Sequence, residues 1–277
     1  MGNCSNFTLF GEAGVAASGT GTVVTGNVGG SGAITGFPDS AQVATGYTVY
    51  DGAGLTPNVA CTTDRDSAYS LLVAETCTNS SVTELADLTL VAGVYCVATS
   101  FTLSSGTLTL AGTASDVWVF ISGTTTIASA NTNVVLTGGA VASNVFWAVG
   151  SSATLTSTTD GVSTFVGTII AHISVSIGTQ IRLHGRALTQ TASVTLAGTD
   201  ILFLPSVNAT EFQESSPTGW AALSPTYQAL ILLGAILVGV GLVVGTVLLV
   251  KRFSSTNGYT KGTDILPGQE TETVTLT

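Results

Sequence analysis

Charged side chains are scarce in this chain of 277 residues. Only 8% of the residues are Asp, Glu, Lys or Arg, against about 25% in an average soluble protein. Six Lys and Arg stand against 16 Asp and Glu, which leaves a net charge of -10. A nucleic-acid binder neutralises phosphates with clustered cations. The chain lacks such a cluster, so we exclude nucleic acid as a partner.

Residues that carry catalytic or metal chemistry are equally few. The two histidines, His172 and His184, have no cysteine or acidic residue at a metal-ligand spacing. The sequence contains neither a phosphate-binding loop of the type Gly-x-x-x-x-Gly-Lys-Ser/Thr nor a Gly-x-Ser-x-Gly nucleophile motif. We therefore predict that the chain is not an enzyme and uses no metal and no cofactor.

Small and hydroxylated residues are what the chain has in abundance. It contains 46 Thr, 28 Ser and 33 Gly, and 45% of its residues are hydrophobic. That hydrophobic content argues against a disordered chain. Short runs alternate between apolar and polar residues, as at 107–110, 117–121 and 173–177, which is typical of half-buried strands. We predict a mainly β unit over residues 1–204.

One hydrophobic run is long enough to cross a membrane. Residues 227–250 carry no charge, and a helix of that length covers about 36 Å, against a hydrocarbon core of about 30 Å. A Lys-Arg pair follows it, which by the positive-inside rule places the tail, 251–277, in the cytoplasm. A polar stalk, 205–226, precedes it. We expect a single-pass membrane protein of a cell surface or viral envelope, with residues 1–204 outside.

The region before this run also has features of an oxidising, glycosylating compartment. Its cysteines are even in number, which suits disulfide formation, and it contains several Asn-x-Ser/Thr sequons. The disulfide candidates are Cys4, Cys61, Cys77 and Cys96, and the glycosylation candidates are Asn3, Asn6, Asn79 and Asn208.

An internal repeat indicates stacked coils. Residues 116–129 align without gaps on 144–157, an offset of 28 residues, and a looser repeat relates 167–177 to 185–196 at 18 or 19 residues. Repeats of this length built from short strands are typical of a β-solenoid. The unequal offsets predict irregular coils. An antiparallel sandwich is the alternative, although hairpin signals are sparse.

One segment has a helical pattern. Residues 62–76 start with threonines that can cap a helix, and their apolar residues recur with a period of 3.6. Cys61 and Cys77 flank the segment, and a straight helix would hold them more than about 20 Å apart. We expect one of them to pair with Cys4 or Cys96, while all three connectivities stay open.

A series of short motifs follows in a fixed order along the chain. The motifs are FTLF (7–10), TGNVG (25–29), AITGF (33–37), DSAY (66–69), LTLVAGVY (88–95), VWVF (117–120), NVFW (144–147), GRALTQT (185–191) and VTL (194–196). This series resembles the ice-binding (antifreeze) protein domain of sea-ice bacteria, diatoms and fungi, over about residues 3–204. The resemblance implies a discontinuous right-handed β-solenoid of triangular cross-section, with one α-helix alongside and one flat face that binds ice.

The residues themselves suit such a face. Ice presents no charge, and threonine offers a hydroxyl, a methyl and a restricted rotamer. Placing the apolar residues of each strand inward, with Ile127 matched to Leu155 by the 28-residue repeat, turns small hydroxylated residues outward. The candidate ice-binding residues are Thr126, Thr154, Thr156, Ser174, Ser176, Thr191, Ser193 and Thr195.

These features together predict a membrane-anchored ice-binding protein whose partner is an ice crystal or another extended surface. A tethered protein cannot diffuse to every growing crystal, so adhesion suits it better than freezing-point depression. The alternative is a non-enzymatic surface adhesin, or a structural envelope or virion protein that reuses the same fold. The pattern of residues gives no indication of whether the chain associates with itself.

Overall fold

The computed structural model describes residues 1–157 and 161–205. The expected span, 227–250, lies outside the described residues, as do the tail, Asn208 and the stalk beyond Pro205. Among the described residues, no helix combines the length and the apolar character needed to cross a membrane.

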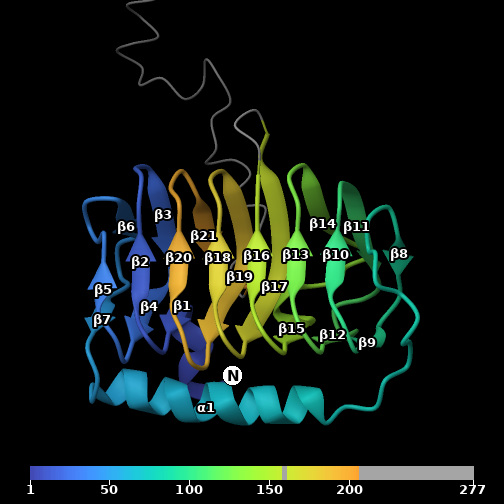
Figure 1. The fold of residues 1–277 in the computed structure, drawn as a ribbon, viewed down its shortest axis with the longest axis horizontal. Helices are drawn as coiled ribbons and strands as arrows, with labels where there is room; N and C mark the ends of the chain where they lie inside the picture. Colours follow the sequence, from blue (N-terminus) through green and yellow to red (C-terminus); the bar gives the residue numbers. More distant parts are fainter. Residues whose placement is uncertain (158–160, 206–277) are drawn as a thin grey trace, which may run out of the picture. The chain divides into compact units, whose positions relative to one another are not determined.

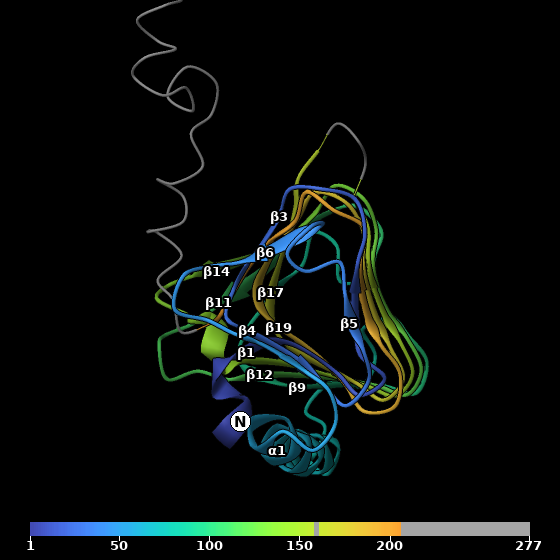
Figure 2. The ribbon, with the colours of Figure 1, turned by 90° about the vertical axis from the view of Figure 1, so that its left-hand side faces the viewer.

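The described chain winds into stacked coils with three sides, seen end-on in Figure 2. All strand pairs between named strands are parallel, as a solenoid requires and a sandwich forbids. One side is a separate sheet of seven strands, visible along the front in Figure 1. Its strands, in spatial order, are β10 (Phe101–Leu103), β13 (Thr126–Ala128), β16 (Ala153–Leu155), β18 (Val175–Ile177), β20 (Val194–Leu196), β2 (Val15–Ala17) and β5 (Ile34–Thr35).

The other two sides share a 14-stranded sheet. Two long strands, β17 (Ser163–Ala171) and β19 (Ile181–Thr189), run from one side onto the other. The side beneath helix α1 also holds β9 (Gly93–Val97), β12 (Trp118–Ser122), β15 (Val145–Val149), β1 (Phe7–Gly11), β4 (Asn27–Gly30) and β7 (Val49–Asp51). The third side also holds β8 (Thr89–Leu90), β11 (Gly106–Ala111), β14 (Thr132–Thr137), β21 (Ile201–Phe203), β3 (Thr22–Thr25) and β6 (Ala41–Val43).

The interior is filled by alternate residues of the strands. Aromatic rings at matching positions of successive coils stack on one another: Phe120 lies 4.0 Å from Trp147 and 5.3 Å from Tyr95, measured between ring centroids. These residues are almost fully buried. Because each ring also covers the next coil, the ladder stabilises the stacking as well as the core.

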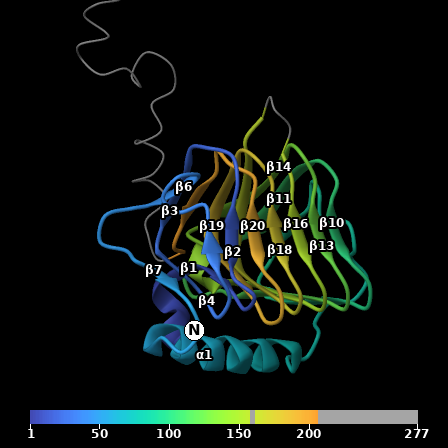
Figure 3. The same cartoon turned by 60° about the vertical axis from the view of Figure 1, so that its left-hand side comes forward.

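The spatial order of the coils differs from their order along the chain. β2 lies between β20 and β5, so the first coils stack against the last one. Helix α1 (Thr56–Val73) then runs the length of the solenoid, from the β5–β7 end to the end where β8, β9 and β10 begin the remaining coils. Figure 3 shows this return path clearly. The expected discontinuity of the solenoid is therefore present.

Helix α1 is longer at its start than the sequence pattern predicts. It begins at Thr56, before the expected start at residue 62, and ends at Val73. Pro57 in the first turn explains the early start, because proline fits the first turn of a helix and needs no hydrogen bond there. The buried side of the helix is largely polar, with Asn58 and Arg65 on it, whereas Leu71 is 70% exposed. Apolar periodicity could not identify that side.

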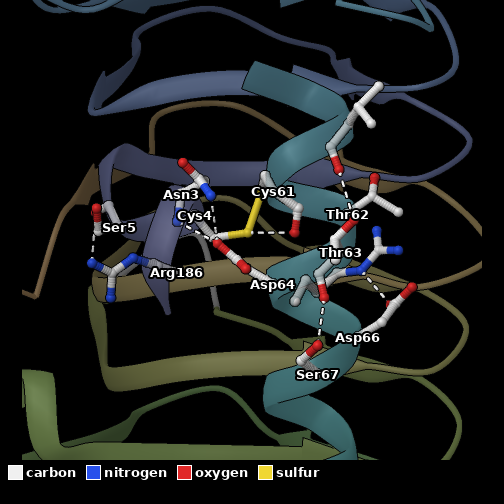
Figure 4. The surroundings of a disulfide bond; sticks show 12 residues. Asn3, Cys4, Ser5, Cys61, Thr62, Thr63, Asp64, Asp66, Ser67 and Arg186 are labelled. Carbon is white, nitrogen blue, oxygen red and sulfur yellow. Dashed lines mark hydrogen bonds and ion pairs between the residues drawn. A yellow bond between two sulfur atoms is a disulfide. The ribbon is translucent and has the colours of Figure 1, made fainter. Parts of the chain in front are cut away.

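Two disulfides anchor the ends of this helix. Cys4 pairs with Cys61 within α1, and Cys77 pairs with Cys96 on β9. Figure 4 shows the first of these, where the backbone N–H of Asn3 also donates to Asp64 at 2.6 Å. That hydrogen bond lowers the pKa of Asp64 below its ordinary value. Of the three connectivities left open by the sequence, the structure has the one that pairs Cys4 with Cys61 and Cys77 with Cys96.

A buried arginine joins the helix to two neighbouring coils, the first and the last along the chain. Arg65 is 1% exposed and donates at 2.9 Å to Glu12, near the N-terminus, and at 2.6 Å to the carbonyl of Thr189 on β19. Asp66 accepts from Arg65 and from Gln190, both at 2.9 Å. Burial of a charge is tolerated only when it is paired and hydrogen-bonded, and the three contacts of Arg65 meet that requirement.

The 28-residue repeat is one residue out of register with the structure. Trp118 pairs with Val145 and Ile127 with Thr154, an offset of 27, whereas the sequence repeat predicts that Ile127 matches Leu155. The looser repeat is confirmed at both offsets, with Gly167 opposite Gly185 and Val175 opposite Val194. A slip of one residue exchanges the two faces of a strand, so it affects the candidate site directly.

A buried carboxyl lies at the corner before β21. Asp200 is fully buried and accepts a hydrogen bond from the backbone N–H of Ile181 at 2.9 Å. Burial raises the pKa of Asp200 to about 7, and hydrogen bonds from neighbouring groups offset only part of that increase. The folded protein therefore holds this proton more tightly than the unfolded chain does.

Removing the disulfide at the start of the helix should destabilise the protein strongly. The bond between Cys4 and Cys61 closes a sequence separation of 57 residues, for which chain entropy gives about 4 kcal/mol of stabilisation. We expect the C4A/C61A variant to lose about that much free energy of unfolding in a denaturant titration followed by tryptophan fluorescence. The matched control is C77A/C96A, which removes a bond that closes a sequence separation of only 19. This variant should lose less free energy of unfolding, about 3 kcal/mol. A larger loss of stability for C77A/C96A than for C4A/C61A would contradict the disulfide connectivity described above.

The pH dependence of stability should reveal Asp200. The pKa of Asp200 is higher in the folded protein than in the unfolded chain. The protonated side chain therefore contributes to the free energy of unfolding in full below about pH 4, and this contribution is lost as the pH rises through about 7. We expect the free energy of unfolding of the wild type, relative to D200N, to fall over this range by at most about 4 kcal/mol, from about three pKa units at 1.36 kcal/mol each. Parallel pH profiles for the two proteins would show that the carboxyl is not perturbed.

Candidate functional site

The outward side chains of the seven-stranded sheet form a surface that we call the hydroxyl face. Most of these strands are three residues long and bury their first and last residues, so only the middle residue of each points outward. The pairing register aligns these middle residues across the sheet. This central row is Thr102, Ile127, Thr154, Ser176, Thr195, Ala16 and Thr35.

Two flanking rows lie one pleat to either side of the central row. They continue the register established by the strands and their backbone hydrogen bonds. The first flanking row, before the strands, is Ser100, Thr125, Ser152, Ser174, Ser193, Gly14 and Ala33. The second, after the strands, is Ser104, Ser129, Thr156, Gly178, Ala197 and Ser18.

Seven of the eight predicted ice-binding residues are at the surface, and six of these lie in the three rows. Thr154, Ser176 and Thr195 occupy the central row, while Ser174 and Ser193 lie in the first flanking row and Thr156 in the second. Thr191 is exposed but lies at the corner after β19, where its hydroxyl donates to the carbonyl of His172 at 2.7 Å.

The placement of Thr126 on the outer surface is wrong. Thr126 is 1% exposed and its hydroxyl lies 3.1 Å from that of Ser122, inside the coil. Its neighbour Ile127 points outward instead and is 37% exposed. The one-residue error in the repeat alignment exchanged the two, because apolarity suggested that isoleucine belongs inside.

The sequence patterns missed three members of the central row. Thr102 precedes the longer repeat, and Ala16 and Thr35 come from the first coils, which reach this sheet only because β2 stacks against β20. Their strands are too short for periodicity to be convincing. A weak signal exists in the similarity of Val15–Ala17 to Val194–Leu196, which the structure pairs residue by residue.

Four of the five central-row hydroxyls, all but that of Thr102, differ in their partners from bonded hydroxyls beside the row. Ser174 donates to Ser152 at 2.9 Å, and Thr156 donates to the carbonyl of Ala128 at 3.0 Å. By contrast, four central-row hydroxyls form no hydrogen bond with any residue of 1–157 or 161–205. These are the hydroxyls of Thr154, Ser176, Thr195 and Thr35. These hydroxyls are therefore open to water.

The hydroxyl face is free of charge within its rows, and the described glycosylation candidates lie elsewhere. Asn3 and Asn6 belong to the short helix η1 (Gly2–Asn6), and Asn3 bonds to α1. Asn79 pairs with Tyr95 of β9, on the side beneath α1. None of these three asparagines belongs to the seven-stranded sheet.

The third side is less uniform. There the register aligns Asn133, Thr164, Arg182 and Ile201, so a cation and a bulky apolar side chain stand among the polar residues. Among the described residues, no group of three His, Cys, Asp or Glu side chains is placed to hold a metal ion. Arg186 has a structural environment: it is buried and donates at 2.7 Å to the carbonyl of Ser5, and burial lowers its pKa to about 10.

Comparison with known proteins identifies the family to which this chain is similar. Residues 9–202 match the family model described as ice-binding-like. The chain is 36% identical over 203 residues to an ice-binding protein of Nostoc sp. (strain HG1), an alignment that covers 71% of each. It is 34% identical over 141 residues to ice-binding protein 1 of Shewanella frigidimarina (strain NCIMB 400), covering 48% of this chain and 15% of that protein.

A solved structure supports the same assignment. The crystal structure of an ice-binding protein from the Antarctic ascomycete Antarctomyces psychrotrophicus is similar to this fold, with a TM-score of 0.65 and 34% sequence identity. The similarity covers 73% of this chain and 96% of that one. The resemblance seen in the sequence motifs is thus confirmed. The chain belongs to the ice-binding-like protein family.

Proposed function

We propose that this protein adsorbs to ice crystals through the hydroxyl face, with Thr154, Ser176 and Thr195 at its centre. Membership of the ice-binding-like family and the similarity to a solved ice-binding protein support the proposal. The observation that carries it is the central row, where Thr154, Ser176 and Thr195 stand at one regular position on successive parallel strands and their hydroxyls form no side-chain hydrogen bond within the described residues.

The physical basis is the order that this surface imposes on water. Neighbouring strands lie about 4.8 Å apart, so the central row repeats at that interval. A hydroxyl can join an ordered water layer, and the threonine methyl disfavours disordered water next to it. The β-branch of Thr154 and Thr195 restricts the side chain to few rotamers, so little entropy is lost when water orders around it. A charged side chain would orient water around itself instead.

We further propose that residues 227–250 anchor the protein in a membrane, with the ice-binding unit outside and the tail in the cytoplasm. The support is the uncharged 24-residue run followed by a Lys-Arg pair. An anchored ice binder holds its bearer to ice, so adhesion is the role that this arrangement suits. The two disulfides among the described residues fit an oxidising compartment outside the cytoplasm.

Bulky substitutions in the central row should weaken adsorption. We expect T154Y and T195Y each to lower the partition of the full chain, kept soluble in mild detergent, into slowly growing ice by about tenfold, or about 1.4 kcal/mol. The tyrosine ring would hold neighbouring hydroxyls away from the crystal. Fluorescence of labelled protein in the ice and liquid fractions measures the partition.

The matched control is T109Y. Thr109 is the outward residue at the middle of β11 on the third side and is half-buried, as Thr154 is. This variant should partition like the wild type. Equal partition of all three variants and the wild type would refute adsorption through the hydroxyl face.

Membrane anchoring has a separate test. When the chain is expressed in cells, it should sediment with membranes and resist extraction by alkaline carbonate, because a spanning helix is released only by detergent. Deletion of 227–250 should move it to the soluble fraction. Protease added to intact cells should remove the domain and spare a tag on the tail. Carbonate-extractable full-length protein would exclude a span.

A further inference from the structure

The two ends of the hydroxyl face differ in whether their hydroxyls are available. At the β10 end, all three rows begin with a hydroxyl that contacts another side chain. Ser100 lies 2.7 Å from the hydroxyl of Thr125, and Thr102 donates to Glu84 at 2.8 Å. Ser104 donates to the same carboxylate through its hydroxyl and, at 3.0 Å, through its backbone N–H.

Glu84 occupies the position that the next central-row residue would take. It forms an isolated parallel bridge with Thr102 and is exposed. Partial burial raises the pKa of Glu84, but hydrogen bonds from Ser104, Ala86 and Thr102 outweigh this and bring the pKa to about 2. A full negative charge therefore stands at this end of the row, and it keeps a hydration shell oriented toward itself.

Ile127 is the second residue of the central row counted from Glu84, directly after Thr102. It lies between Thr102 and Thr154, and it is the only large side chain in the central row. Isoleucine extends one carbon–carbon bond, about 1.5 Å, beyond the outermost atoms of threonine. With 37% of its surface exposed, it stands above its neighbours and separates Thr102 from the rest of the row.

The opposite end has no such obstacle. From Thr154 through Ser176, Thr195 and Ala16 to Thr35, every central-row side chain is small. A carboxylate also lies near this end, but Asp51 accepts from the backbone N–H of Ile34 at 2.9 Å, before the outward residue of the strand. It forms no bond with the hydroxyl of Thr35 within the described residues.

We propose that Ile127 and Glu84 set the limit of the ice-contact surface, which is confined to the outward residues of β16, β18, β20, β2 and β5. This inference rests on the proposed function. The first coils of the chain then supply two of the five central positions, Ala16 and Thr35. Thr102 lies beyond the limit, because its hydroxyl is bonded to Glu84 and its approach to a flat crystal is blocked by Ile127.

Three variants of the full chain, measured in detergent by partition into growing ice, test the limit. T35Y should reduce the partition by about tenfold, equivalent to about 1.4 kcal/mol, although it lies at the far end from the longer repeat. T102Y should match the wild type. I127T should raise the partition by about threefold, since it lowers the obstacle and adds a hydroxyl on the next coil. Circular dichroism and thermal midpoints confirm that each variant is folded.

The outcomes separate this inference from the proposed function. If T102Y reduces partition as much as T35Y, the limit is refuted while adsorption through the hydroxyl face stands. If I127T partitions into ice like the wild type, Ile127 does not limit the ice-contact surface. If T35Y does not fold, A16Y on the neighbouring strand replaces it with the same expected loss. If no substitution on this face has an effect, including T154Y and T195Y, both proposals fail.

Discussion

The property on which this structure depends is the register of parallel pairing between successive coils. Most strands of the hydroxyl face are three residues long, so each presents one outward side chain. A shift of one residue would bury that side chain and expose its neighbours. Backbone hydrogen bonds and inward packing of residues such as Leu155 and Val175, both essentially buried, hold the register. A flat row of hydroxyls is therefore a consequence of how the core packs.

The stack also needs closure, because its first and last coils meet through residues far apart in the sequence. Val15 pairs with Val194, and this contact is reinforced outside the sheet by Arg65, which bridges Glu12 and the carbonyl of Thr189. A guanidinium is suited to this task because its several N–H donors satisfy several acceptors from a fixed plane. Helix α1 thus acts as a clamp along the solenoid, and its buried polar residues explain why it shows so little amphipathic pattern.

Several carboxylates of the described chain lie at the margins of the sheets. Three of them accept hydrogen bonds from backbone N–H groups there: Asp51 from Ile34, Glu84 from Ser104 and Asp87 from Thr107. An uncapped edge strand would invite pairing with another chain. Acidic side chains at these edges therefore protect the stack, while the three rows of the hydroxyl face between them stay uncharged.

The sequence by itself determined the class of fold, because alternation, repeat length and abundant small residues are local properties. It also indicated a helix alongside and the even set of cysteines, and it identified Thr154, Ser176 and Thr195 as outward residues. Only the tertiary structure decided that Ile127 points out while Thr126 points in, since register depends on the neighbouring coil. The same holds for Ala16, which joins the row by pairing with the distant Thr195, for Thr35, which pairs in turn with Ala16, and for the disulfide connectivity. Pairing between distant segments leaves no periodic trace in either segment alone, so their partnership exists only in the folded chain.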